Sequence, residues 1–303
     1  MAGHETITAL QVQLASVLAG KDDAIRSLLI TLLAGGHLLI EDVPGVGKTT
    51  LAHGLASSLK SDFGRIQFTA DLLPADIIGV EIFDPAKQQF LFHPGAVFNH
   101  IVLADEINRA TPKAQSALLE AMAEGQVTIE RQTRALPQPF FVIATQNSNE
   151  HMGTFPLPES QLDRFFMRIS IGYPNPEAER KLLLGEAGQS RLSSLEPVAD
   201  WSDILAARQA IAELHVSDAL LDYLLQLVRE SRNGQWLKQG ISPRAGHDLI
   251  NAARAHAWLA GQSYVTAADV QSIWLACLSH RIEAVGDCHE ALTALLESIP
   301  VPA

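Results

Sequence analysis

One short segment constrains this chain more than any other: residues 37–50, which read HLLIEDVPGVGKTT. The apolar run at its start predicts a buried strand, and leucines at positions 51, 55 and 59 mark one face of a following helix. The glycines between them let the backbone approach a phosphate closely, while the N–H groups at a helix start favour an anion. The segment therefore predicts a strand, a phosphate-binding loop and a helix.

The end of this loop carries the groups that phosphate binding needs. Lys48 supplies positive charge for the outer phosphates of a nucleotide, and Thr49 offers a hydroxyl to Mg²⁺. Asp42 stands where the general pattern asks for glycine, so the match fails by one residue. A chance turn before a buried helix would not explain Gly-Lys-Thr at the helix start. We expect nucleotide contacts from Asp42, Val43, Pro44, Gly45, Val46, Gly47, Lys48, Thr49 and Thr50.

Length, charge and cysteine content limit the class of protein. At 303 residues the chain is long enough for two domains and a sizeable core. Its net charge of −12 argues against a broad basic surface for nucleic acid or an anionic membrane. No apolar stretch reaches the roughly 20 residues of a membrane span, and the N-terminus lacks a signal-peptide pattern. Two cysteines favour a reducing, cytoplasmic location, and Cys277 lies in an apolar helix pattern that predicts a buried thiol rather than a metal ligand.

Two acids follow a second apolar run. Residues 101–104 predict a strand buried on both faces, and Asp105 and Glu106 follow it directly. Ligands bind at this end of the strands in α/β sheets, so both acids are expected near the phosphate loop. Asp105 can hold Mg²⁺ through water, and Glu106 can orient and polarise an attacking water. Such a pair is weak evidence alone, but at this distance after the loop it indicates a hydrolase.

Two further polar residues suggest contact with an anion. Asn147 follows a third apolar strand, predicted over residues 140–145. Its amide can hydrogen-bond either the terminal phosphate or the attacking water, although taken singly it can equally be a turn residue. Arg244 lies in the first turn of a predicted helix, where it opposes the helix dipole. Solvent exposure would make that cost small, and we favour the alternative in which Arg244 and the helix start hold an anion jointly.

The order of predicted elements divides the chain near residue 175, at a Pro-Asn-Pro run. Before it, strands and helices alternate, with two hairpins near residues 79–95 and 127–136. We therefore expect an α/β domain over residues 1–174 and an all-helical domain over residues 175–303. The helices predicted in the second domain span residues 177–184, 201–214, 219–230, 243–260 and 267–280.

Together these motifs resemble the MoxR family of AAA+ ATPases over nearly the whole chain. The resemblance rests on residues 41–49, 105–110, 144–147, 153–165 and 242–245. The last two segments are far more specific than a phosphate loop alone. The family fold is a parallel sheet flanked by helices, with two β-hairpin inserts, followed by an all-helical lid domain. The resemblance therefore implies this fold, with the two predicted hairpins as the inserts.

The resemblance also assigns roles around the nucleotide. Lys48 and Thr49 form the Walker A motif, Asp105 and Glu106 form the Walker B motif, and Asn147 is the sensor 1 residue. The implied ligands are ATP and Mg²⁺, with Thr49 and Asp105 as the metal-binding residues.

Two arginines receive roles from the same resemblance. Arg164 matches the arginine finger that reaches a neighbour's site, and Arg244 matches the sensor 2 arginine of the lid, which we expect at the chain's own site. An arginine on one subunit and a nucleotide site on another require a heterologous contact, which closes into a ring or runs on as a helix. The resemblance implies a homo-oligomer, usually a hexameric ring, that remodels or activates client proteins beside a partner with a von Willebrand factor A domain.

Other functions are compatible with the same ATPase core. A nucleic-acid motor or loader is one, but the acidic balance and the lack of a Lys/Arg cluster with interleaved aromatics weigh against it. A chelatase motor subunit is another, and only its partners would distinguish it. A small-molecule kinase is least expected, because a glutamate placed for water and an arginine on the lid suit hydrolysis. We therefore predict an ATP-driven remodelling protein.

Overall fold

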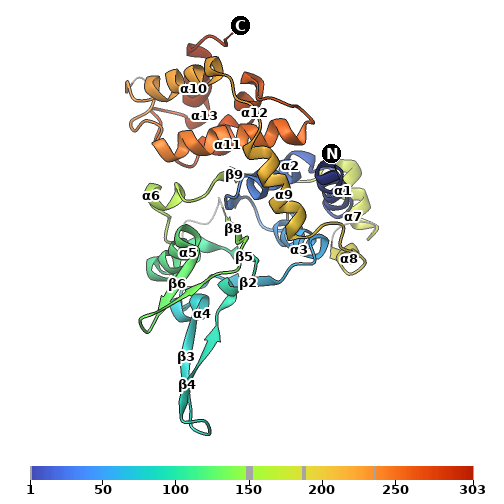
Figure 1. Ribbon diagram of the computed structural model, residues 1–303, viewed down its shortest axis with the longest axis vertical. Coiled ribbons are helices and arrows are strands. Elements are labelled where there is room, and N and C mark those ends of the chain that lie inside the picture. The colour runs from blue at the N-terminus through green and yellow to red at the C-terminus, as the bar shows by residue number, and fades with distance from the viewer. Residues whose placement is uncertain (1, 148–152, 186–188, 235, 303) are drawn as a thin grey trace.

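Five parallel strands form the sheet on which the molecule is built (Figure 1). The computed structural model describes residues 2–147, 153–185, 189–234 and 236–302. The strands lie in the order β2-β5-β8-β1-β9, and every neighbouring pair is parallel. The carboxyl ends of β1, β5 and β8 therefore meet at one edge. The strand bounds are Leu38–Glu41 (β1), Phe63–Gln67 (β2), Ile101–Asp105 (β5), Phe141–Gln146 (β8) and Met167–Ile169 (β9).

Separate apolar clusters cover the two faces of the sheet. Leu38 and Ile40 of β1 belong to one cluster, with residues of α1, α2 and α3, whereas Leu39 belongs to the other, with residues of α4 and α5. Alternate strand residues point to opposite faces, so helices on both sides explain why the strands are apolar throughout. The helices and turns of this half are α1 (Ala2–Val17), α2 (Asp22–Leu33), α3 (Lys48–Ser58), α4 (Pro74–Ile78), η1 (Ala96–Phe98), η2 (Ile107–Arg109), α5 (Pro112–Glu124) and α6 (Glu159–Leu162).

Two β-hairpins leave this core at the predicted positions. The first, β3–β4, projects far from the body of the molecule (Figure 1). Its base requires glycine, since a Cβ at Gly95 would collide with the carbonyl oxygen of Ile77. The second, β6–β7, is joined to it by the ion pair of Arg134 with Glu81, 2.8 Å long. The bounds are Gly79–Asp84 (β3), Gln89–Pro94 (β4), Gln126–Ile129 (β6) and Gln132–Ala135 (β7).

The second half of the chain is helical. The five predicted helices are present as α7, α9, α10, α11 and α12, and α8 and α13 are additional helices. The cap of α13 is a recognisable signal, because the Asp287 side chain accepts a hydrogen bond from the N–H of Glu290. The bounds are Pro176–Leu183 (α7), Gln189–Leu192 (α8), Trp201–Ala212 (α9), Asp218–Glu230 (α10), Pro243–Leu259 (α11), Ala267–Leu278 (α12) and Cys288–Ser298 (α13).

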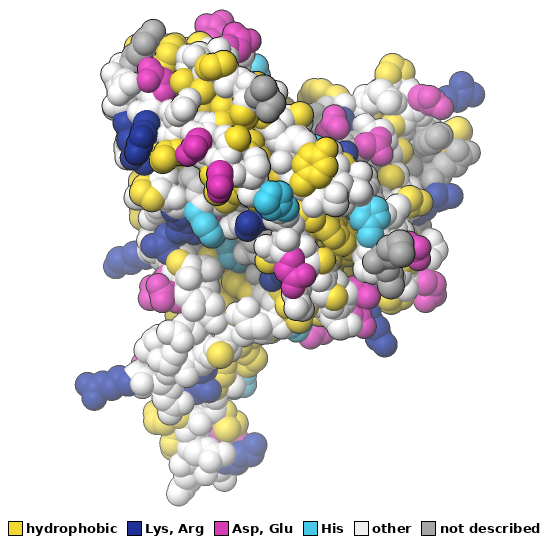
Figure 2. Space-filling view, turned by 45° about the horizontal axis from the view of Figure 1, so that its top comes forward, with side chains coloured by type: hydrophobic (Ala, Val, Ile, Leu, Met, Phe, Trp, Pro, Cys, Tyr) yellow, Lys and Arg dark blue, Asp and Glu magenta, His cyan; other side chains and the backbone are white. Residues whose placement is uncertain are grey.

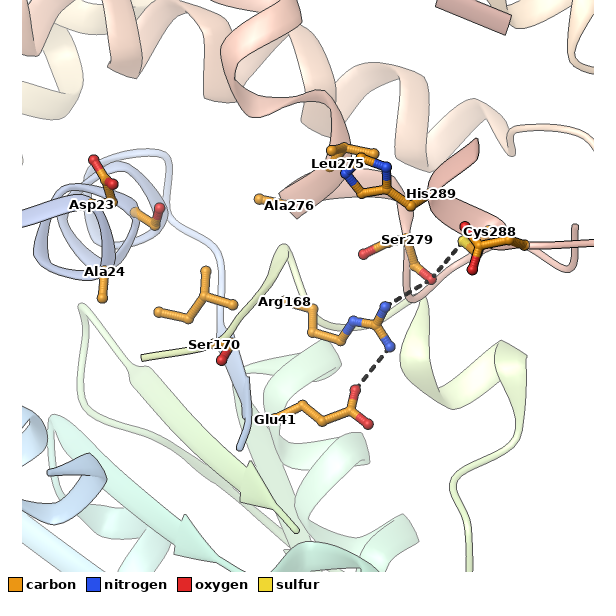
Figure 3. A pocket seen from close by; sticks show the side chains of 13 residues that line it. Asp23, Ala24, Glu41, Arg168, Ser170, Leu275, Ala276, Ser279, Cys288 and His289 are labelled. Carbon is orange, nitrogen blue, oxygen red and sulfur yellow. Dashed lines mark hydrogen bonds and ion pairs between the residues drawn. The ribbon is translucent and has the colours of Figure 1, made fainter. Parts of the chain in front are cut away.

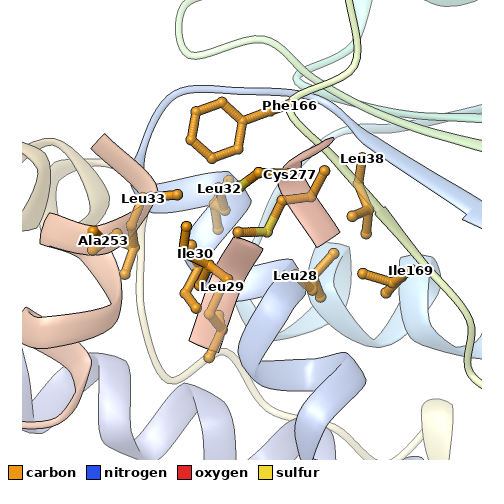
Figure 4. Packing of buried hydrophobic residues seen from close by; sticks show 14 of the residues in the cluster. Leu28, Leu29, Ile30, Leu32, Leu33, Leu38, Phe166, Ile169, Ala253 and Cys277 are labelled. Carbon is orange, nitrogen blue, oxygen red and sulfur yellow. The ribbon is translucent and has the colours of Figure 1, made fainter. Parts of the chain in front are cut away.

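The apolar core continues from the first half of the chain into the second. Helices α8 and α9 pack on α1, α2 and α3, while α11 contacts α2 and α12 contacts β9. Figure 4 shows Cys277 of α12 among residues of α2, close to Phe166. Cys277 is buried, as predicted, and burial raises the pKa of its thiol to about 12. The domain boundary after residue 174 stays a prediction. Within the described ranges, no helix is long and apolar enough to cross a membrane.

Candidate active site

The predicted phosphate loop, the two acids and the amide meet at the carboxyl edge of the sheet. They enclose a pocket of about 260 Å³. The loop follows β1, the acids stand at the end of β5, and the amide follows β8. The structure therefore brings together groups from three separate strands. The lining residues are Pro44, Gly45, Gly47, Lys48, Thr49, Thr50, Asp105, Glu106 and Asn147.

The shape of the loop depends on two glycines. Gly45 has a φ of 84° and Gly47 a φ of 99°, which other residues rarely adopt. A Cβ at Gly47 would also lie 2.6 Å from the side chain of Leu18. Gly47 is the N-cap of α3, so the helix begins at Lys48 with its first N–H groups at the pocket. Such a helix start attracts an anion.

Lys48 is buried at the centre of the site. Its ammonium donates to the carbonyl oxygens of Asp42 at 2.9 Å and Val43 at 3.1 Å, and to Oδ1 of Asn147 at 3.2 Å. The other end of that amide, Nδ2, donates to Oε1 of Glu106 at 3.3 Å. Asn147 thus joins the cation of the loop to the acid of β5. A ligand phosphate at Lys48 would compete with Asn147 for the ammonium.

The side chain of Asp42 does not face the pocket. One carboxylate oxygen accepts hydrogen bonds from the N–H groups of Ile171 and Gly172, both at 2.6 Å, and from the Ser170 hydroxyl at 2.9 Å. The other accepts from the N–H of Val43 at 2.8 Å. Burial opposes the charged form, but these hydrogen bonds outweigh it and lower the pKa of the carboxyl. Asp42 therefore holds the loop to the segment after β9. Neither Asp42 nor Val43 is among the residues that line the pocket, and the nucleotide contacts expected of them stay predictions.

Asp105 is held from two sides by residues for which the sequence predicted no role. Its Oδ1 accepts from the Thr145 hydroxyl at 2.7 Å, and its Oδ2 accepts from the Arg65 guanidinium at 2.8 Å. Arg65 comes from β2, which pairs with β5 in the sheet. Thr49 and Asp105 line the same pocket and offer the oxygen donors that Mg²⁺ prefers. These two residues therefore fit the predicted metal ion.

Glu106 has an uncommon backbone conformation for a residue with a side chain, with a φ of 57°. Its N–H donates to the hydroxyl oxygen of Thr145 at 2.9 Å, which helps to hold this turn. Its Oε2 accepts from Arg109 at 2.9 Å and from Gln67 at 3.2 Å. Exposed polar residues alternate with buried ones along β2, and this pattern is the only feature of the local sequence that marks Gln67 as exposed. The carboxylate is thus fixed in direction at the pocket.

A second pocket, of about 160 Å³, adjoins the first, and Gly45, Gly47 and Thr50 line both. Val46, expected at the nucleotide, lines this second pocket. Its other walls come from the end of α1, the segment after it, α7 and the residue Pro174. They are mostly apolar, which suits a flat ring such as a nucleobase. The remaining lining residues are Val17, Leu18, Ala19, Lys21 and Leu182.

Arg164 lines neither of these pockets. Its guanidinium donates to the carbonyl oxygen of Leu119 in α5 at 2.7 Å, and within the described segments no acid forms an ion pair with it. The segment that carries it leads into β9, whose first residue, Met167, pairs with Leu38 at the start of β1. The phosphate loop follows the other end of β1. Arg164 therefore lies at the opposite edge of the sheet from its own chain's pocket.

Arg244 is also remote from the pocket of its own chain. It is exposed in the first turn of α11. Ser242, two residues before it, donates to Oδ1 of Asp163 at 3.5 Å, and the N–H of nearby Phe166 donates to the carbonyl oxygen of His37 at 2.8 Å. His37 stands directly before β1, so Arg244 lies near the start of that strand. The structure therefore places Arg244 near the amino-terminal edge of the sheet and not in the pocket lining of its own chain, and its action on a nucleotide stays a prediction.

A cleft of about 760 Å³ lies between the sheet edge and the last helices (Figure 3). Arg168 crosses it, donating to Glu41 at 2.8 Å and to the carbonyl oxygen of Ser279 at 3.3 Å. Cys288 and His289 line the same cleft. No group of three His, Cys, Asp or Glu side chains in the described ranges could hold a metal ion. Arg168 is thus a link between the two halves of the chain.

Comparison with known proteins agrees with this geometry. Residues 37–167 match the ATPase family associated with various cellular activities (AAA), and residues 229–294 match the AAA lid domain. Over 279 residues the chain is 40% identical to Chaperone MoxR1 of Mycobacterium tuberculosis, covering 88% of this chain and 72% of that protein. The chain belongs to the MoxR family of AAA ATPases.

Two further comparisons bear on this MoxR-family member. A crystal structure of a Cytophaga hutchinsonii protein has a TM-score of 0.89 and 34% identity, and covers 100% of this chain and 96% of that one. Magnesium-chelatase subunit ChlI of Pyropia yezoensis is more distant, at 26% identity over 222 residues, covering 72% of this chain and 59% of that protein. The predicted family and the predicted fold are therefore both confirmed.

Proposed function

We propose that this MoxR-family chain binds ATP with Mg²⁺, hydrolyses it, and uses the reaction to remodel client proteins. The observation that carries the proposal is the meeting of Lys48, Thr49, Asp105, Glu106 and Asn147 at one pocket, beside an apolar pocket that suits the base. The outer phosphates would lie against Lys48 and the start of α3. Thr49 and Asp105, the latter through water, would hold Mg²⁺, whose charge would neutralise that of the phosphates.

Glu106 is the general base in this proposal. Arg109 and Gln67 hold one of its carboxylate oxygens, while the other contacts Asn147 at 3.3 Å. A water beside that second oxygen can give its proton to Glu106 as it attacks the terminal phosphate. Asn147 also contacts Lys48, so its amide can orient this water or the phosphate once ATP occupies the loop. Binding and water activation are therefore coupled through one side chain.

The remaining two arginines support an assembly in which each site is completed by a neighbour. Arg164 and Arg244 both lie near the start of β1, and neither lines the pocket of its own chain. Asp163, next to Arg164, accepts a hydrogen bond at 3.5 Å from Ser242, which caps the helix of Arg244. Arginines on one side of a subunit and a pocket on another make a heterologous contact, which can close into a ring. We propose a hexameric ring in which both arginines stabilise charge on the neighbour's nucleotide.

The client and partners are proposed by analogy with the relatives. The name of Chaperone MoxR1 supports a protein client. A partner with a von Willebrand factor A domain is proposed only from the family resemblance of the motifs. Similarity to a magnesium-chelatase subunit makes a chelatase motor the second candidate. A nucleic-acid motor is less favoured, since Lys and Arg side chains are scattered among acidic ones on the face shown in Figure 2. These candidates can be separated by identifying the molecules that bind to Glu106→Gln protein in the presence of ATP. Lys48→Ala protein, which should not bind ATP, is the control.

Mixing two inactive variants tests the proposed catalysis. Arg164→Ala subunits keep Glu106, and Glu106→Gln subunits keep Arg164, so each can supply what the other lacks. An arginine finger supplied by a neighbouring subunit raises the rate of hydrolysis by about 10³–10⁵-fold where it has been measured. ATP turnover should therefore reappear on mixing, once native mass spectrometry shows mixed assemblies. Mixed assemblies without turnover would exclude action of Arg164 on a neighbour, and a wild-type chain without Mg²⁺-dependent turnover would refute the ATPase proposal.

A further inference from the structure

A buried arginine joins the second half of the chain to the segment that carries Arg164. Arg281 follows α12, and its side chain is only 1% exposed. Its guanidinium pairs with Asp248 at 2.8 Å and with Asp163 at 3.4 Å. It also donates to the carbonyl oxygens of Phe165 at 2.6 Å and Phe166 at 3.0 Å. A buried charge is costly unless it is paired, so this full set of acceptors accounts for its burial.

The acceptors of Arg281 come from two parts of the fold. Asp248 belongs to α11, whereas Asp163, Phe165 and Phe166 surround Arg164 in sequence. The planar guanidinium presents its donors in a rigid fork, so it fixes the direction of the groups that it binds. Residues on both sides of Arg164 are thus held in place from the helical half of the chain.

The same carboxylate also receives a hydrogen bond from the start of α11. Ser242, the N-cap of that helix, donates to Oδ1 of Asp163 at 3.5 Å, the oxygen that Arg281 contacts. Arg244 is two residues beyond Ser242, in the first turn of α11. The backbones that carry the two arginines are therefore tied to one carboxylate. Their spacing is set by this cluster and not by the nucleotide pocket of their own chain.

We infer that Arg281 is a positioning residue that holds Arg164 and Arg244 at a fixed spacing for use on a neighbour's nucleotide. The inference rests on the proposed action of those arginines in trans. Arg281 is buried and away from its own chain's pocket, so it contacts no nucleotide itself. A displacement of about 1 Å caused by a remote mutation can cost about 10²-fold in rate. Loss of Arg281 would therefore act on turnover in the adjacent subunit.

Replacement of Arg281 by lysine tests the inference. One ammonium cannot span two carboxylates and two carbonyls in a fixed plane, although it keeps the buried charge. Arg281→Lys subunits should bind ATP with unchanged affinity, since Lys48 and its loop are intact, and should lose about 10²-fold in turnover. In mixtures with Glu106→Gln subunits, only the Arg281→Lys subunits keep Glu106. ATP turnover per Arg281→Lys subunit should rise in these mixtures, because a Glu106→Gln neighbour supplies a correctly held Arg164.

A matched control removes another link between the two halves of the chain. Arg168 also joins a carboxylate of the first half of the chain to a carbonyl oxygen of the second, but neither of these hydrogen bonds involves residues 163–166. Whether or not Arg168→Gln lowers ATP turnover, mixing Arg168→Gln subunits with Glu106→Gln subunits should not raise the turnover per Arg168→Gln subunit. A gain with this control as well would mean that Glu106→Gln partners merely stabilise assemblies, and would overturn the inference.

The other outcomes are equally distinct. Turnover of Arg281→Lys within a few-fold of wild type, or a loss that mixing does not restore while Arg164→Ala is restored, would refute a positioning role in trans. If neither variant is restored in confirmed mixed assemblies, the proposed action of Arg164 fails and this inference falls with it. Should Arg281→Lys not fold, Asp163→Asn keeps the Arg281–Asp248 pair and should give the same rescue.

Discussion

Replacing Asp42 by alanine should destabilise the protein strongly, although its side chain does not line the nucleotide pocket. Asp42 is 6% exposed, and its carboxylate accepts four hydrogen bonds, two of them from the N–H groups of Ile171 and Gly172. Each donor left without a partner costs about 1–3 kcal/mol, so we expect a loss of about 2–5 kcal/mol in the free energy of unfolding. Urea denaturation at neutral pH measures this loss. ATP affinity should also fall, because the loop is no longer held.

Asp200→Ala is the matched control for this prediction. Asp200 is exposed and accepts a similar set of hydrogen bonds from Ser202 and Asp203, so its loss should cost less. Equal losses for Asp42→Ala and Asp200→Ala would refute the reasoning.

The stability that Asp42 contributes should also depend on pH. The folded-state pKa of Asp42 lies below its ordinary value of 3.8, so the carboxylate stabilises the fold above that value and loses this effect as the pH falls through the folded pKa.

Other perturbations test the site directly. Lys48→Ala should weaken ATP binding by about tenfold or more, since a charge-assisted contact contributes about 1.5–3 kcal/mol, and unchanged affinity for a fluorescent ATP analogue would remove the phosphate-loop assignment. Glu106→Gln should bind ATP normally and hydrolyse it about 10²–10⁴-fold more slowly, and single-turnover rates near wild type would mean that another residue polarises the water. ATP should increase the mass seen by light scattering, because its terminal phosphate gives a neighbour's arginines a partner. Equal mass with and without nucleotide would count against this, unless the ring is constitutive.

The pocket itself is predictable because each of its parts is a local pattern. Lys48 follows a glycine at a helix start, Asp105 and Glu106 end an apolar strand, and Asn147 follows another. Parallel strands bring such ends to one edge whatever their order. Local sequence therefore suffices for these residues.

The partners of these groups are not predictable in the same way. Arg65 meets Asp105 only because β2 lies beside β5, and Thr145 reaches it only because β8 lies on the other side. The order of the strands depends on the whole chain and cannot be predicted from a short stretch of sequence. Arg244 shows the same limit on a larger scale, because helical periodicity says which face of α11 is apolar but not the edge of the sheet at which the helix docks.

The apolar core shared by the two halves of the chain has a mechanical consequence. Side chains of α2 pack with Phe166 and with Cys277 of α12 in a single cluster (Figure 4). Close-packed interiors transmit strain and resist the sliding of one element over another, so each chain should move as one rigid body. The pivots of the proposed ring would then lie between chains, where the arginines of one subunit reach the phosphates of the next. Hydrolysis would rotate whole subunits against each other and leave the interior of each one unchanged.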